Sequence, residues 1–134
     1  MIILSLDPGH TTGWCKIDVV ENQPSYVFSG NISVKNGNLA HALRHLLNED
    51  LDAVIIERLP HNLPPIMSTV RTTINEATKS YEFLEISVEV GPGEWKPVTR
   101  RYPLPKLDWR TTQHERDAWR MGVFWLWKEG LVKI

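Results

Sequence analysis

The sequence predicts an α/β protein built on a mixed sheet of five strands that is flanked by helices. Residues 1–6 and 53–56 are short, almost purely apolar segments, which is typical of central strands buried on both faces. β-rich segments follow the first of them, and segments with helical spacing of apolar residues then alternate with the remaining strands. This order of elements indicates sheet and helix layers packed in a single domain, residues 1–134.

The first half of the chain is predicted to form a meander of three strands and then a helix. The strands cover residues 1–6, 13–20 and 26–34. The turn-forming run Glu-Asn-Gln-Pro-Ser at residues 21–25 separates the last two strands. After Gly37, leucines and alanines recur at helical spacing and predict a helix that ends near Glu49.

The second half is predicted to alternate between strands and helices. A buried strand at residues 53–56 runs directly into Glu57. A helix over residues 66–84 and a strand over residues 85–90 follow. Residues 91–110 contain several prolines and are predicted to be irregular.

The last helix carries its own start signal. Thr112 and Glu115 have the spacing of a capping box, which assigns Glu115 to capping rather than to catalysis. His114 and Asp117 are three residues apart and therefore share a helix face. Apolar residues continue that face toward the sheet, namely Ala118, Met121, Gly122 and Trp125. Both polar side chains are therefore expected to point at the sheet.

Polar side chains also end the two most apolar strands. Asp7 enters a Pro-Gly turn directly after the first strand, and Glu57 ends the fourth. A carboxylate at the end of a buried strand costs free energy unless a cation meets it. If the two strands are parallel neighbours, both carboxylates emerge at the sheet edge where α/β proteins bind ligands. Three carboxylates and one imidazole meeting there predict a site for Mg²⁺ or Mn²⁺.

These residues carry a resemblance to a known family. The run Asp7-Pro8-Gly9-His10-Thr11-Thr12-Gly13, the segment Ile55-Ile56-Glu57 and the pattern His114-(x)₂-Asp117-Ala118 occur in this order. Together they resemble the RuvC family of Holliday-junction resolvases, in a short, phage-like version. The resemblance implies an RNase H-like fold and an endonuclease that makes paired nicks across a four-way DNA junction, leaving 5′-phosphates.

The resemblance also implies a site and partners. It places Asp7, Glu57, His114 and Asp117 at the metal-ligand positions of two Mg²⁺ ions, for which Mn²⁺ is expected to substitute. Val88-(x)₂-Gly91-Pro92-(x)₂-Trp95-Lys96 stands where the family carries a functional lysine, which suggests that role for Lys96. A homodimer acting on branched DNA is implied as well.

Charge gives a local rather than a global signal for DNA. The chain has a net charge of −1, but one stretch holds five cations against one acid, Asp108. These candidate phosphate contacts are Lys96, Arg100, Arg101, Lys106 and Arg110.

Composition indicates the cellular location of the protein and excludes an internal disulfide. The single cysteine, Cys15, excludes an internal disulfide and is expected to be a small buried hydrophobe. The apolar runs are too short to span a bilayer, so no membrane partner is expected. A cytoplasmic location follows as an expectation, which is the host cytoplasm if a phage encodes the chain.

Three other functions remain open on the sequence. A nuclease of the same fold acting on RNA or on RNA·DNA hybrids would use the same carboxylates. An actin-like or sugar-kinase ATPase would use Asp7, Thr11 and Thr12 to grip a phosphate, although that architecture needs two such domains. A non-catalytic DNA-binding module would have no need for clustered acids, which cost stability.

Overall fold

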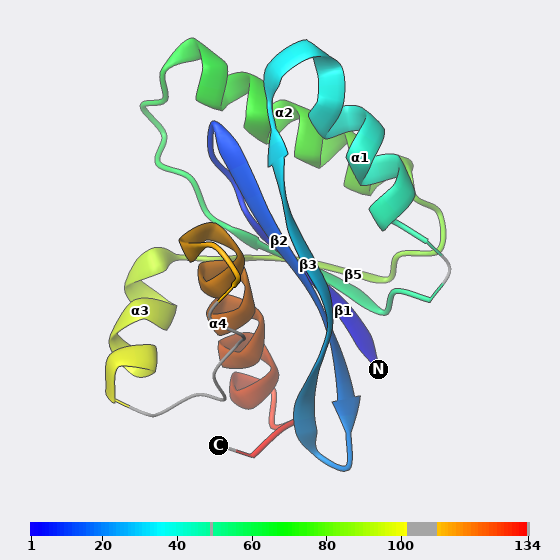
Figure 1. Cartoon of the computed structure of the whole chain (residues 1–134), viewed down its shortest axis with the longest axis vertical. Coiled ribbons are helices and arrows are strands. Elements are labelled where there is room, and N and C mark those ends of the chain that lie inside the picture. The colour runs from blue at the N-terminus through cyan, green and yellow to red at the C-terminus, as the bar shows by residue number, and fades with distance from the viewer. Residues whose placement is uncertain (49, 102–109, 134) are drawn as a thin grey trace.

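The computed structural model describes residues 1–48, 50–101 and 110–133. It contains five strands, a short 3₁₀ turn at Lys35–Gly37 and four α-helices (Figure 1). The strands are β1 (Ile2–Asp7), β2 (Thr11–Val20), β3 (Gln23–Ser33), β4 (Ala53–Glu57) and β5 (Ile86–Val90). The helices are α1 (Asn38–Leu46), α2 (Pro65–Ser80), α3 (Pro92–Arg101) and α4 (Gln113–Lys128).

The strands form one mixed sheet in the order β3-β2-β1-β4-β5. The first three strands are antiparallel neighbours, and both β1–β4 and β4–β5 are parallel. The predicted meander is therefore confirmed, and the two apolar strands are parallel neighbours, which is the condition for bringing their terminal carboxylates together. The turn between β2 and β3 is shorter than predicted, because Glu21 and Asn22 alone form it with positive φ angles of 52° and 63°.

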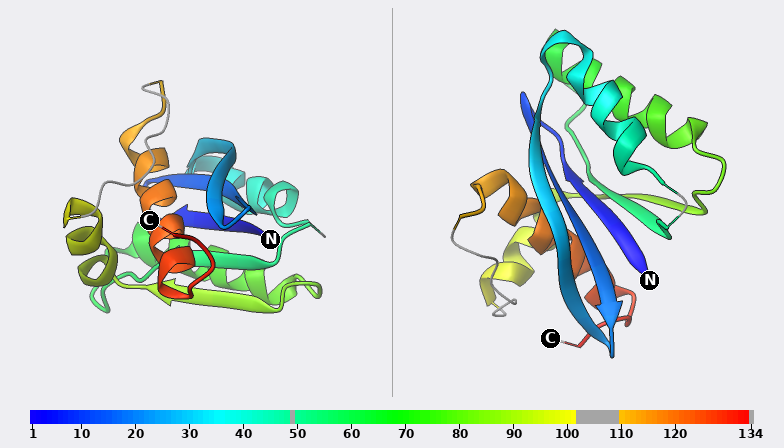
Figure 2. Two further views of the ribbon diagram at one scale, coloured as in Figure 1. Left: turned by 90° about the horizontal axis from the view of Figure 1, so that it is seen from below. Right: turned by 45° about the vertical axis from the view of Figure 1, so that its right-hand side comes forward.

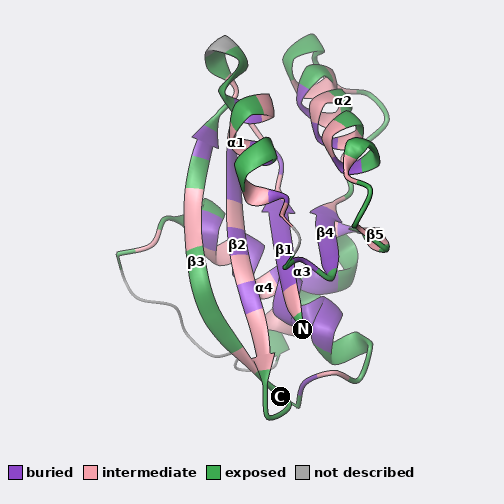
Figure 3. Ribbon diagram, turned by 90° about the vertical axis from the view of Figure 1, so that its right-hand side faces the viewer, coloured by how far each residue is buried: buried purple, intermediate pink, exposed green. Residues whose placement is uncertain are grey.

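Helices cover both faces of the sheet, as the views in Figure 2 show. Leu4 and Leu6 of β1 pack toward α1 and α2 on one face, and Ile3 packs toward α4 on the other. Figure 3 shows the consequence, with β1 and β4 buried and the edge strand β3 largely exposed. Burial on both faces explains why the central strands are almost purely apolar. Cys15 is fully buried, as expected.

Helix α4 is the more deeply buried of the long helices because it is covered twice. Ala118, Met121, Gly122 and Trp125 are buried, as predicted for the sheet-facing side. Trp119 and Val123, on another side, are buried as well. Helix α3 packs against α4 and joins the same core through Trp95 and Val98. None of the described helices has the length and apolar content needed to cross a bilayer.

The start of α4 is fixed by a capping box, which confirms the prediction. The Thr112 hydroxyl accepts from the Glu115 N–H at 3.3 Å, and the Thr112 N–H donates to Glu115 Oε2 at 2.8 Å. Glu115 also accepts hydrogen bonds from Ser29 at 2.6 Å and from Asn31 at 3.2 Å. Both partners lie on β3, so this one carboxylate joins the helix start to the sheet.

The prediction that residues 91–110 are irregular is wrong for residues 92–101, which form α3. Proline is accommodated at the first helical position, where no backbone N–H is needed, and Pro92 occupies it. Glu94 Oε2 then accepts from the Gly91 N–H at 2.7 Å, which caps the helix start. The rest of the predicted segment, residues 102–109, lies outside the described residues.

Two further helix ends differ from the prediction. Helix α2 ends at Ser80 rather than at residue 84, because Tyr81 has extended φ and ψ angles. Helix α1 ends at Leu46, whereas the predicted end at Glu49 lies outside the described residues.

Replacing Glu115 tests the link between α4 and the sheet. Burial alone raises the pKa of Glu115, but its hydrogen bonds outweigh burial and leave that pKa below the ordinary 4.5. Its stabilising contribution is therefore present above pH 4.5 and is lost as the pH falls through the lowered pKa. Glu115→Ala is expected to lower the free energy of unfolding at pH 7 by about 2–3 kcal/mol, measured by urea denaturation.

The matched control is Glu76→Ala, which removes an exposed carboxylate from α2. This control should stay within about 0.5 kcal/mol of the wild type. Equal losses for the two variants would contradict the assigned role of Glu115.

Candidate active site

Two neighbouring strands bring Asp7 and Glu57 to the same edge of the sheet. β1 and β4 are parallel, and Leu6 pairs with Ile56, so the next residue of each strand is an acid. Asp7 and Glu57 are both partly buried. The expected convergence of both carboxylates at the carboxyl edge is therefore found.

The first turns of α4 bring His114 and Asp117 to this edge. His114 Nδ1 lies 3.7 Å from Asp7 Oδ2. This approach depends on Gly13 of β2, which pairs with Asp7. A Cβ at Gly13 would lie 2.3 Å from the His114 carbonyl oxygen and 2.7 Å from its Cβ, which no side chain permits. Gly13, the last residue of the run that starts at Asp7, thus leaves the space that lets α4 reach the sheet.

Asp7 is the most perturbed carboxyl group of the site. Its pKa is raised from 3.8 to about 7, first by burial and then by the negative charges of Glu57 and Asp117. His114 opposes this shift through its charge and its hydrogen bond. Three carboxylates therefore interact at one point with too little positive charge to balance them.

Glu57 is held by a residue that the sequence analysis did not single out for the site. The indole N–H of Trp95 donates to Glu57 Oε2 at 2.8 Å, and Trp95 is 2% exposed. Burial raises the pKa of Glu57, while the Trp95 hydrogen bond and the charge of Lys96 lower it, and the charge of Asp117 raises it. Helix α3 thus supplies both a hydrogen-bond donor and a cation to this carboxylate.

Asp117 is held by two residues of its own helix. Gln113 Nε2 donates to Asp117 Oδ1 at 2.8 Å, and Arg120 Nη1 lies 3.5 Å from the same oxygen. Asp117 therefore has acidic neighbours on the side of the sheet, and a hydrogen-bond donor and a cation along α4.

The donor set fits a hard divalent cation in its chemistry. Carboxylate oxygens with one imidazole nitrogen suit Mg²⁺ or Mn²⁺, and the raised pKa of Asp7 shows how poorly its negative neighbours are balanced. As they stand, however, no three His, Cys, Asp or Glu side chains of residues 1–48, 50–101 and 110–133 are grouped to hold one ion. Glu57 and Asp117 are instead engaged by Trp95, Gln113 and Arg120, through oxygens for which an ion would compete.

The predicted basic stretch is divided by the structure. Lys96 lies beside Glu57, with its Nζ 5.5 Å from the centre of the Trp95 ring. Lys96 and Arg100 line a cleft of about 400 Å³ between α3 and α4 that also contains Asp117. Arg101 and Arg110 are exposed, whereas Lys106 lies outside the described residues.

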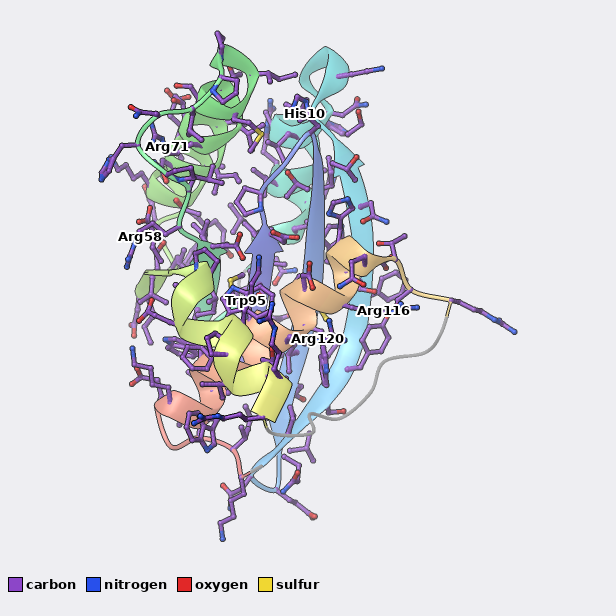
Figure 4. All side chains as sticks on the ribbon, turned by 90° about the vertical axis from the view of Figure 1, so that its left-hand side faces the viewer. His10, Arg58, Arg71, Trp95, Arg116 and Arg120 are labelled. Atoms are coloured by element: carbon purple, nitrogen blue, oxygen red, sulfur yellow. The ribbon has the colours of Figure 1, made fainter. Side chains whose placement is uncertain are left out.

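Other cations near the site were missing from the prediction. Figure 4 shows Arg58 and Arg71 on one flank of Trp95 and Arg116 and Arg120 on the other. Arg71 lines a small cavity together with Glu57, and Arg58 directly follows Glu57 in the chain. The i, i+3 spacing of Asp117 and Arg120 was the one available sequence signal, since such pairs meet on a helix surface.

Solved structures similar to this chain are found, whereas comparisons of its sequence find no match. No protein-family model and no curated protein matches the chain. RuvC from Thermus thermophilus superposes with a TM-score of 0.74 at 15% identity, covering 99% of both chains. Its complex with a Holliday junction substrate gives 0.73 at 14% identity, covering 99% of this chain and 98% of the other. The fowlpox virus Holliday junction resolvase gives 0.63 at 14% identity, covering 96% and 99%.

These similarities extend over nearly every residue of the chain. The chain therefore has the RNase H-like fold of RuvC, with a five-stranded mixed sheet between two layers of helices.

Proposed function

We propose that this chain is a metal-dependent endodeoxyribonuclease that resolves four-way DNA junctions by paired, symmetric nicks. The observation that carries the proposal is the meeting of Asp7, Glu57, His114 and Asp117 at one sheet edge, where Asp7 has a pKa of about 7. The fold supports it, since solved structures with this fold include one with a Holliday junction substrate. Residues 1–134 would form the whole nuclease domain.

Each residue of the site has a distinct part in this proposal. Asp7, Glu57, His114 and Asp117 would hold two Mg²⁺ ions, with Mn²⁺ as a substitute. When bound, the ions would supply the positive charge that stabilises the attacking and leaving oxygens of a phosphodiester displacement. Lys96 would place its ammonium group against the scissile phosphate, and Trp95 would orient Glu57 as a positioning residue.

The substrate is expected to lie across the cationic surroundings of the site. Phosphate contacts set affinity and register on DNA without reading sequence. The predicted contacts are Lys96, Arg100, Arg101, Lys106 and Arg110. Arg58 and Arg71 add to them on the other flank of Trp95. Paired nicks require two active sites on one junction, so we propose a homodimer, which light scattering during size-exclusion chromatography tests.

The substrate class is tested by comparing three nucleic acids under one condition. The protein with Mg²⁺ is expected to cut a synthetic four-way junction faster than a linear duplex or an RNA·DNA hybrid. Faster cutting of the hybrid would support the second candidate function, an RNA-directed nuclease of the same fold. Thermal stabilisation by ATP, together with no cutting at all, would favour a nucleotide-binding protein.

Asp7 is expected to be essential for cleavage. Asp7→Asn keeps the size of the side chain but removes the charge that faces both other carboxylates, so junction cleavage should fall at least about a hundredfold. The measurement is single-turnover cleavage of the junction in Mg²⁺. Asp18→Asn is the matched control. It makes the same substitution at an aspartate that contacts the N-terminal amine at 3.6 Å and not the residues of the site. Wild-type cleavage by Asp7→Asn would overturn the proposal.

The same variant is expected to be more stable than the wild type when metal is chelated. Because the folded state raises the pKa of Asp7 from 3.8 to about 7, it binds a proton that the unfolded state has lost. The contribution of Asp7 to folding stability therefore falls as the pH rises between these two values. At pH 8 in EDTA, Asp7→Asn should be more stable by about 1–3 kcal/mol in urea denaturation. A less stable variant would contradict the clustering of charge.

Lys96 is expected to affect the rate of cleavage but not the fold. Lys96→Ala should lower single-turnover cleavage about 10- to 100-fold, because one positive charge beside Glu57 is lost. Lys79→Ala, which removes an exposed lysine from α2, is the matched control. An unchanged rate for Lys96→Ala would exclude this role, provided that both variants unfold at the wild-type temperature.

A further inference from the structure

The cleft between α3 and α4 combines an excess of positive charge with direct access to the site. Four of its lining residues come from α3 and three from α4. They are Trp95, Lys96, Thr99 and Arg100, and Gln113, Asp117 and Arg120. Three cations therefore face one carboxylate, that of Asp117. Within the described residues, neither Lys96 nor Arg100 forms an ion pair. A cleft with this charge suits an anion.

Arg120 belongs both to the cleft and to the site. Its Nη1 lies 3.5 Å from Asp117 Oδ1, and its side chain is 41% exposed. The same Asp117 raises the pKa of Asp7 by its charge, so it also acts on the carboxylates at the sheet edge. Arg120 thus supplies positive charge to Asp117, as Lys96 does to Glu57.

A divalent cation would compete with Arg120 for Asp117. Exposed ion pairs with long side chains are weak, because solvent screens them and ordering the side chains costs entropy. A divalent cation that interacts with several carboxylates at once would bind Asp117 more strongly than Arg120 does. Once released, Arg120 remains in a cleft with Lys96 and Arg100. Its planar guanidinium is suited to bind phosphate oxygens in pairs.

We propose that Arg120 couples metal binding to DNA binding by exchanging partners. Without metal it is the counter-ion of Asp117. With metal it binds a phosphodiester group of the DNA backbone in the α3–α4 cleft, beside Lys96 and Arg100. This inference rests on the proposed function, and it adds a second phosphate subsite next to the one assigned to the scissile group.

The first test measures metal binding in the absence of DNA. Arg120→Met keeps a long side chain but removes the competitor for Asp117, so Mn²⁺ should bind about two- to fivefold more tightly in calorimetry. A residue that merely supported the fold would weaken metal binding when replaced. Arg44→Met, an exposed arginine of α1, is the matched control and should bind Mn²⁺ as the wild type does.

The second test measures binding of a four-way junction with Ca²⁺ or with EDTA. In Ca²⁺, Arg120→Met should lose about threefold or more in affinity, and the slope of log affinity against log salt should fall by about one. In EDTA, where Arg120 stays with Asp117, the loss should be below about twofold. The same loss under both conditions, or an unchanged or weakened Mn²⁺ affinity, overturns the inference.

The wild type separates this result from failure of the proposed function. If wild-type protein neither binds Mn²⁺ nor cuts the junction, the proposed function fails. If it does both, and Arg120→Met behaves as the wild type does, only the partner exchange fails.

Discussion

The close approach of α4 to β2 is the constraint on which the rest of the site depends. Two glycines make it possible, since a Cβ at Gly122 would lie 2.6 Å from Ile17 Cδ1 and a Cβ at Gly13 would collide with His114. The capping box and the hydrogen bonds from β3 to Glu115 hold the helix start in that position. Because α4 supplies both His114 and Asp117, a shift of this helix by the width of a methyl group would separate them from Asp7.

The site is an arrangement of unfavourable charges that the fold holds together. Burial and neighbouring acids raise the pKa of Asp7, and burial raises that of Glu57. Hydrophobic packing of β1, β4 and α4 on both sides of the sheet outweighs this local cost. Trp95, Gln113 and Arg120 partly satisfy the carboxylates with hydrogen bonds and charge. The balance resembles that of active sites in general, where stability is lower than in the rest of the fold.

Much of this arrangement could be predicted from the sequence, because it depends on local rules. Apolar runs identified β1 and β4, and spacing gave the capping box, whereas the parallel pairing that places Asp7 beside Glu57 was a condition that the structure met. Helix α3 was not predicted, because prolines favour an irregular segment, although Pro92 stands at the first helical position, where proline is well tolerated. The Trp95–Glu57 bond joins residues 38 positions apart and leaves no periodic signal. Only the folded chain shows that the basic stretch divides between a cleft and the exposed end of a helix.

The position of α4 in the chain has a consequence for how the candidate site is assembled. All five strands are synthesised before α4, yet this helix covers Ile3, Cys15 and Ile17 and completes the group around Asp7. A nascent chain that has emerged only as far as its last strand therefore carries an uncovered apolar face and an incomplete group around Asp7. Since contacts between such distant segments form late and slowly, burial of that face and completion of this group would occur in one event.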